Sequence, residues 1–102
     1  GRARQLTSEL EPSKYLQQRY NNYPELIELD KFCKACSILR KNKAFAMPCR
    51  QAGEFIGMSW KTASAYLKIL CREGRLNLLE KGKPRQKGEK SKANIYEYIG
   101  ET

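Results

Sequence analysis

The amino-acid sequence predicts a mainly α-helical domain that ends in a small β-hairpin, an α+β fold. Two patterns support this prediction. Apolar residues recur every three or four positions over residues 24–41 and again over residues 59–72, which is the helical period. After Gly74 the pattern becomes alternation, in RLNLLE and later in NIYEYIG, which is the strand period. The 102 residues are enough for one modest hydrophobic core.

The first dozen residues differ in character from the rest. GRARQLTSELEP is polar and ends at a proline, so we expect residues 1–12 to be a polar leader or linker and residues 13–102 to form the domain. Gly1 stands in place of an initiator methionine, which indicates a piece of a longer protein. Ser13 can cap a short helix that Pro24 ends.

A longer helix is expected from residue 24 or 25 to about residue 41. Proline suits a first helical turn because its missing N–H would have no helical partner there. The predicted buried stripe consists of Leu26, Leu29, Phe32, Cys33, Cys36 and Leu39. Acidic residues come early in this segment and basic residues late, which suits the helix dipole. A brief strand is expected at residues 44–47.

Residues 50–73 contain two shorter helices joined by a tight turn. Gly53 is small enough for the helices to cross closely, and Gly57 can adopt the left-handed backbone of the turn. Ser59 can cap the second helix, over residues 59–72. The positions expected to point inward are Ile56, Met58, Ala63, Tyr66, Leu67 and Leu70.

The stretch AGEFIGMSWKTASAYLKILCREGRL, followed by a hairpin over about residues 75–100, resembles the helix-turn-helix and wing of the winged-helix family. The resemblance covers residues from roughly 25 onward and implies a winged helix-turn-helix with an additional N-terminal helix. The chain also resembles the origin-binding modules of phage and plasmid primase-helicase proteins, which act in DNA replication. This second resemblance implies two partners: duplex DNA, and the remainder of a larger replication protein. A transcriptional repressor is the alternative role.

In such a domain the second helix would lie in the major groove with its outward face toward the bases. The candidate DNA-binding residues of this helix are Ser59, Trp60, Lys61, Thr62, Ser64, Lys68 and Arg72. Lysines can bond guanine acceptors or phosphates, and hydroxyl groups can bond either bases or phosphates. Two positions stay open for the Trp60 side chain. It points outward to a sugar or a thymine methyl group, or it packs beneath the wing.

The expected hairpin tip, KGKPRQKGEKSK, is strongly basic. Its basic residues are Lys81, Lys83, Arg85, Lys87, Lys90 and Lys92. We expect those from Lys83 onward to neutralise phosphates and to make the affinity depend on salt. Arg85 is the candidate for insertion into a minor groove.

The formal net charge of +9 favours a polyanionic partner. Two other kinds of module stay open. One is a winged helix that binds proteins, and the other binds RNA or single strands with Trp60, Tyr96 and Tyr98 as stacking surfaces. No apolar run is long enough to span a bilayer, so no membrane partner is expected. The oligomeric state stays open.

Four cysteines, Cys33, Cys36, Cys49 and Cys71, allow a zinc site, a redox pair or core thiols. Cys33 and Cys36 continue an apolar helical stripe, so we predict reduced core thiols in a cytoplasmic protein, and no metal. The chain has no histidine and no glycine-rich phosphate loop. We therefore predict no cofactor and no enzymatic activity for this chain, whereas a parent primase-helicase would be an enzyme.

Overall fold

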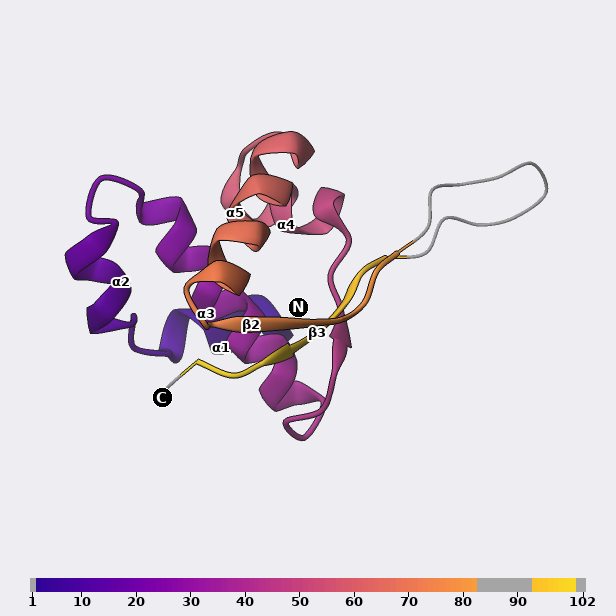
Figure 1. Ribbon diagram of the computed structural model, residues 1–102. Helices are drawn as coiled ribbons and strands as arrows, with labels where there is room; N and C mark the ends of the chain where they lie inside the picture. The colour runs from indigo at the N-terminus through magenta and orange to yellow at the C-terminus, as the bar shows by residue number, and fades with distance from the viewer. Residues whose placement is uncertain (1, 83–92, 101–102) are drawn as a thin grey trace.

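The computed structural model describes residues 2–82 and 93–100, and Figure 1 shows their arrangement. The elements in chain order are α1 (Arg2–Glu9), α2 (Lys14–Arg19), α3 (Pro24–Leu39), β1 (Phe45–Ala46), α4 (Cys49–Ile56), α5 (Trp60–Arg72), β2 (Leu76–Glu80) and β3 (Ile95–Tyr98). Helices dominate and the strands form one small sheet, so the predicted α+β class is confirmed.

The sheet, within the described residues, has the strand order β1-β3-β2, and both pairings are antiparallel. The brief strand expected before Pro48 is β1, where Phe45 faces Tyr96 of β3. In the other pairing Leu76 faces Tyr98. The register of β2 shifts between Leu78 and Glu80, which leaves Leu79 as the extra residue of a bulge. The middle strand β3 therefore pairs with β2, its partner in the hairpin, and with β1, which precedes α4.

Helix α3 runs through the centre of the molecule and contacts α1, α2, α4, α5 and β3. Its buried leucines share one apolar cluster with Leu67 and Leu70 of α5 and with Phe45 of β1. Phe32 of α3 stacks on Phe55 of α4, with ring centroids 4.0 Å apart. Burying a leucine or phenylalanine side chain stabilises a fold by about 1.5–3 kcal/mol. This cluster therefore holds α4 and α5 in place. Leu39, expected in the buried stripe, is exposed at the last turn of α3.

The N-terminal segment differs from the expected polar leader or linker. Residues Arg2–Glu9 form helix α1, which packs against α3. Thr7 is buried, and its hydroxyl donates a hydrogen bond to the carbonyl oxygen of Ala3. The guanidinium of Arg4 lies 5.3 Å from the ring centroid of Phe55. Packing on α3 explains the helix, since the segment itself has few apolar residues.

Two predicted helix starts are confirmed. The hydroxyl oxygen of Ser13 accepts a hydrogen bond from the backbone N–H of Leu16, at 3.3 Å, and begins α2. Pro24 occupies the first turn of α3. Local sequence signals therefore set both helix starts.

Candidate nucleic-acid interface

The turn between α4 and α5 is tight, as its glycines predict. Gly57 ends α4 with a left-handed backbone (φ +71°), and its N–H donates to the carbonyl oxygen of Gly53. A β-carbon added at Gly53 would lie 2.7 Å from the backbone oxygen of Met58. A larger residue at position 53 would therefore push the turn away from α4. These two glycines fix where α5 begins.

Ser59 caps α5, as predicted. Its hydroxyl oxygen accepts from the backbone N–H of Thr62 at 3.3 Å. The Ser59 hydroxyl in turn donates to the Thr62 hydroxyl oxygen, at 3.1 Å. The Thr62 hydroxyl keeps its own proton to donate elsewhere. Both candidate residues thus have a local role in starting the helix.

One face of α5 is buried and the opposite face is open. Ala63, Leu67 and Leu70 are buried. The exposed residues are Trp60, Lys61, Ala65, Lys68 and Arg72, while Thr62 and Ser64 are partly exposed. Positions 61, 65, 68 and 72 follow the helical repeat, so Lys61, Lys68 and Arg72 line one stripe.

Of the two predicted positions of the Trp60 side chain, pointing outward or packed beneath the wing, the structure shows the outward one. Its side chain is 52% exposed, at the start of α5. The ammonium of Lys61 lies 5.8 Å from the centroid of its ring. Such a cation–π contact holds the lysine beside the indole at the leading end of the helix.

The predicted burial of Met58 was wrong, and two tyrosines named in one of the alternatives are less exposed than that alternative needs. Met58 is 37% exposed, because it lies beyond the left-handed residue where the chain turns away from α4. Tyr96 is 4% exposed and belongs to the core. Tyr98 is partly buried, with the guanidinium of Arg75 5.5 Å from its ring centroid. Tyr96 and Tyr98 are therefore not the exposed stacking surfaces that one alternative requires.

Only the base of the predicted wing lies within the described residues. There, the side-chain oxygen of Asn94 accepts from the backbone N–H of Gly82 at 2.6 Å, which ties the two strands together. Lys81 is exposed at this base. The candidate residues Lys83, Arg85, Lys87, Lys90 and Lys92 lie outside the described residues.

The cations of α5 differ from two others that are paired with carboxylates of the protein itself. Lys31 pairs with Glu28 at 3.1 Å, and Arg75 pairs with Asp30 at 3.1 Å. Over residues 2–82 and 93–100, Lys61, Lys68 and Arg72 form no ion pair. Their charges remain available to a partner.

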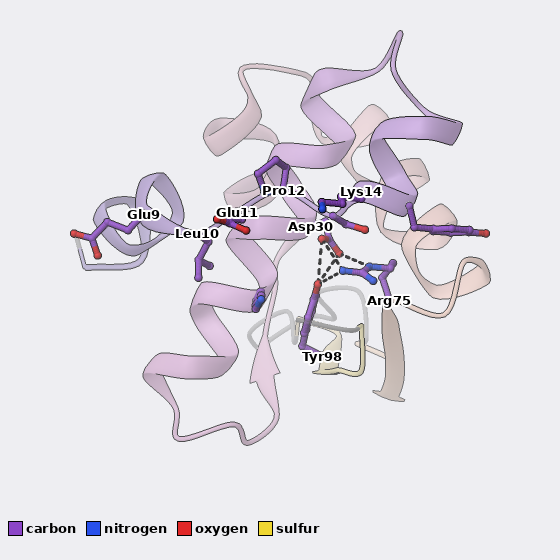
Figure 2. Close-up of a pocket in the computed structure, with 11 residues that line it drawn as sticks. Glu9, Leu10, Glu11, Pro12, Lys14, Asp30, Arg75 and Tyr98 are labelled. Carbon is purple, nitrogen blue, oxygen red and sulfur yellow. Dashed lines mark hydrogen bonds and ion pairs between the residues drawn. The ribbon is translucent and has the colours of Figure 1, made fainter.

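A second polar site lies where α3 meets the sheet, at a pocket of about 570 Å³ that is lined by α3, Arg75, Tyr98 and the connection from α1 to α2 (Figure 2). The Arg75 guanidinium donates to both carboxylate oxygens of Asp30, at 3.1 and 3.2 Å. It also donates to the Tyr98 hydroxyl at 2.6 Å, and that hydroxyl lies 3.1 Å from each Asp30 oxygen. Burial raises the pKa of Tyr98 far above its usual value, and the Asp30 charge raises it further. The polar groups bond one another, so this network joins α3 to the sheet.

The cysteine side chains pack in or against the hydrophobic core, as predicted. Cys33 is fully buried, and Cys36, Cys49 and Cys71 pack against the cluster that contains it. Burial raises the pKa of the thiols of Cys33, Cys36 and Cys71, which keeps them protonated. In the described part of the chain, no group of three or more Cys, Asp or Glu side chains could hold a metal ion.

Comparison with known proteins finds no family model, no curated relative and no solved structure that matches this chain. No helix of the described residues is both long enough and apolar enough to cross a bilayer.

Proposed function

We propose that this chain is a winged helix-turn-helix domain that binds duplex DNA through α5. The observation that carries the proposal is the stripe of Lys61, Lys68 and Arg72 on the open face of a helix whose start is fixed by a tight turn. From residue 61 to residue 72 a helix rises by about 16 Å, and a helix of normal diameter fits the major groove.

The order of the elements supports the same proposal. Helix α3, strand β1, the α4–α5 pair and the β2–β3 hairpin follow one another as in a winged helix, with β1 paired to β3. Lys61, near the start of α5, would reach base edges, and Lys68 and Arg72 would reach phosphates or bases. Trp60 would contact a sugar or a thymine methyl group.

The wing would add affinity more than specificity. Its basic residues Lys83, Arg85, Lys87 and Lys90 would neutralise phosphates, each releasing counterions. Replacing all four by alanine should weaken binding to every duplex alike. Each lost phosphate contact should lower the slope of log affinity against log salt by about 0.9. Titration at several salt concentrations tests this, and an unchanged slope would contradict it.

The test of α5 is the double variant Lys61→Ala/Lys68→Ala. Duplexes selected from a random pool provide a preferred target, and fluorescence anisotropy compares that target with random duplex. The wild-type preference should fall by about tenfold or more, since each good base contact contributes about 1–3 kcal/mol of discrimination. Circular dichroism should show an unchanged fold, because both side chains are exposed.

The matched control is Lys41→Ala/Lys43→Ala, which removes the same charge. These exposed lysines lie in the turn between α3 and β1, at the opposite end of the molecule from the α4–α5 turn (Figure 1). The control should lose affinity only slightly and keep the preference. Equal losses in both double variants would overturn the assignment of α5.

The resemblance to origin-binding modules extends the proposal to DNA replication, with the domain anchoring a larger primase-helicase to its origin. Reading the full gene tests this extension. Helicase motifs in the same reading frame would support it, and a complete short repressor gene would contradict it.

A further inference from the structure

Ala65 lies at the centre of the open face of α5, among the cations of that face. A helix turns by about 100° per residue, so Ala65 lies within about 60° of Lys61, Lys68 and Arg72 around the helix axis. By the same geometry it lies about 140–160° from each of the buried residues of α5. Ala65 is exposed, so no neighbouring side chain covers its methyl group. Its side chain therefore points directly away from the core.

The methyl group of Ala65 is a short apolar group between longer, charged side chains. Along the helix axis it lies about 6 Å from Lys61 and about 4.5 Å from Lys68. Trp60 lies about 140° from Ala65 around the axis, on the other side of Lys61. The ammonium of Lys61 lies 5.8 Å from the centroid of the Trp60 ring, so this contact draws the lysine away from Ala65. The centre of the open face is therefore apolar, although the residues around it are cations.

Only one kind of base edge suits an apolar group at this position. In the major groove the bases present hydrogen-bond donors and acceptors, and thymine adds its C5-methyl group. A donor or acceptor pressed against the Ala65 methyl group would lose its water without gaining a hydrogen bond, which is costly. A methyl group in the same place removes apolar surface from water on both sides, which is favourable. The chemistry of this position therefore selects thymine among the four bases.

The size of Ala65 favours the same contact. A helix with its side chains is about 10–12 Å across, and the major groove is about 12 Å wide, so the fit leaves little room. A short residue at the centre of the face lets the helix approach the base edges closely. Lys68 and Arg72 on the same face can then reach phosphates. An isolated methyl group among three cations is too small a patch to bind a protein by apolar contact.

We propose that Ala65 recognises the C5-methyl group of a pyrimidine, normally a thymine, and so sets the base preference at one position of the target duplex. The proposal rests on the proposed function, because it requires α5 to lie in the major groove. It adds the residue that selects a base and the chemical group that is selected. 5-Methylcytosine carries a methyl group on the same ring carbon, so it is a second possible source of that group.

The experiment starts from the preferred duplex selected from a random pool. Each thymine in turn is replaced by deoxyuridine, which lacks only the methyl group, and fluorescence anisotropy measures the affinity. At one thymine the wild-type affinity should fall by about fourfold, the effect of burying one methyl group. Ala65→Ser puts a hydroxyl group at the contact, so the two duplexes should bind it nearly equally. Both duplexes meet the same variant, so a loss of folded protein cancels in this ratio.

Three further variants assign the methyl contact to Ala65. Ser64→Ala/Ala65→Ser moves the hydroxyl group by one position at constant composition, and it should lose the dependence on the methyl group. Ser64→Ala alone should keep it. Trp60→Ala should also keep it at that thymine, because Trp60 lies on another side of the helix. An unchanged ratio in Ala65→Ser, or a lost ratio in Trp60→Ala, would overturn the proposal.

The same assay separates the two sources of the methyl group. A duplex with 5-methylcytosine paired to guanine at that position is compared with its cytosine counterpart and with the thymine duplex. The methyl group should raise the affinity over cytosine. Tighter binding than to the thymine duplex would identify the modified cytosine as the preferred base, and no gain over cytosine would contradict recognition of the methyl group.

The failure of this proposal differs from the failure of the proposed function. A wild-type preference for the selected duplex that is lost in Lys61→Ala/Lys68→Ala, but is insensitive to deoxyuridine at every thymine, would refute the role of Ala65 and leave α5 assigned. Equal wild-type affinity for selected and random duplexes would overturn both proposals.

Discussion

Arg72 and Arg75 are three residues apart in the chain, yet one belongs to the open face of α5 and the other to the interior. Arg72 is exposed and forms no ion pair within the described residues. Arg75 is 6% exposed and bonds both carboxylate oxygens of Asp30. A buried charge must be paired, because leaving it alone in a medium of low dielectric is costly. The net charge of +9 therefore does not by itself show which cations can contact a partner, since the buried ones are already paired within the protein.

The largest effect should come from breaking the interior pair. Asp30→Ala leaves the Arg75 guanidinium buried without its carboxylate, so the free energy of unfolding should fall by about 3–5 kcal/mol. Arg72→Ala should change it by less than about 0.5 kcal/mol. Urea unfolding of both variants measures the difference. Similar losses of unfolding free energy in Asp30→Ala and Arg72→Ala would contradict the difference between the interior pair and the open face.

Alkaline pH should weaken the same network. The pKa of Tyr98 is raised in the folded state from its usual value of 10.0, first by burial and then by the Asp30 charge. The neutral hydroxyl thus stabilises the fold fully below about pH 10, and this contribution is lost as the pH rises through the folded-state pKa. Urea unfolding from about pH 8 to pH 11 should show stability falling. Tyr98→Phe should fall less steeply, and parallel curves would contradict this assignment.

A smaller loss is expected from the scaffold that holds α5. In Gly53→Ala the new methyl group meets the Met58 backbone oxygen, so the free energy of unfolding should fall by about 1–3 kcal/mol. The displaced turn should also weaken duplex binding, although no proposed DNA contact is removed. Ala65→Gly, on the exposed face, provides a stability control with a cost of about 1 kcal/mol from helix propensity alone. Unchanged stability and binding in Gly53→Ala would mean that the turn tolerates displacement.

Ser59 is the boundary case, because it is exposed and yet bonded within the fold. Ser59→Ala removes the cap of α5, which should lower the free energy of unfolding by about 1 kcal/mol. Ser59→Asp restores an acceptor at the cap and should recover most of that stability. It also adds a negative charge to the proposed interface, so it should bind duplex more weakly than Ser59→Ala. Thermal melts and duplex titrations separate the two roles.

Local signals predicted much of the fold. Pro24, Gly57 and Ser59 each act within one helical turn, so the sequence alone places the helix boundaries that they determine. The interior network could not be predicted in this way. Arg75 is 45 residues from Asp30, and Tyr98 is 68 residues from it. No periodicity links such positions, so the alternation of β3 left open which of its faces is buried.

The candidate site shows the same limit. The open face of α5 follows from helical spacing, so the exposed positions of Lys61 and Lys68 were predictable. The contact between Tyr15 of α2 and Glu73 at the end of α5 could not be predicted, because it joins residues 58 positions apart. Helix α1 was missed for a related reason, since its buried Thr7 is held by packing on α3.

The bulge at Leu79 has a consequence for how the domain behaves at high concentration. Strand β2 lies at the edge of the sheet, and Leu78 and Leu79 are exposed on it. A regular edge strand with apolar side chains is a template on which further chains can polymerise. The irregular register interrupts the row of backbone groups that an added strand would need. We therefore expect the bulge to protect the protein from edge-to-edge aggregation during expression and storage.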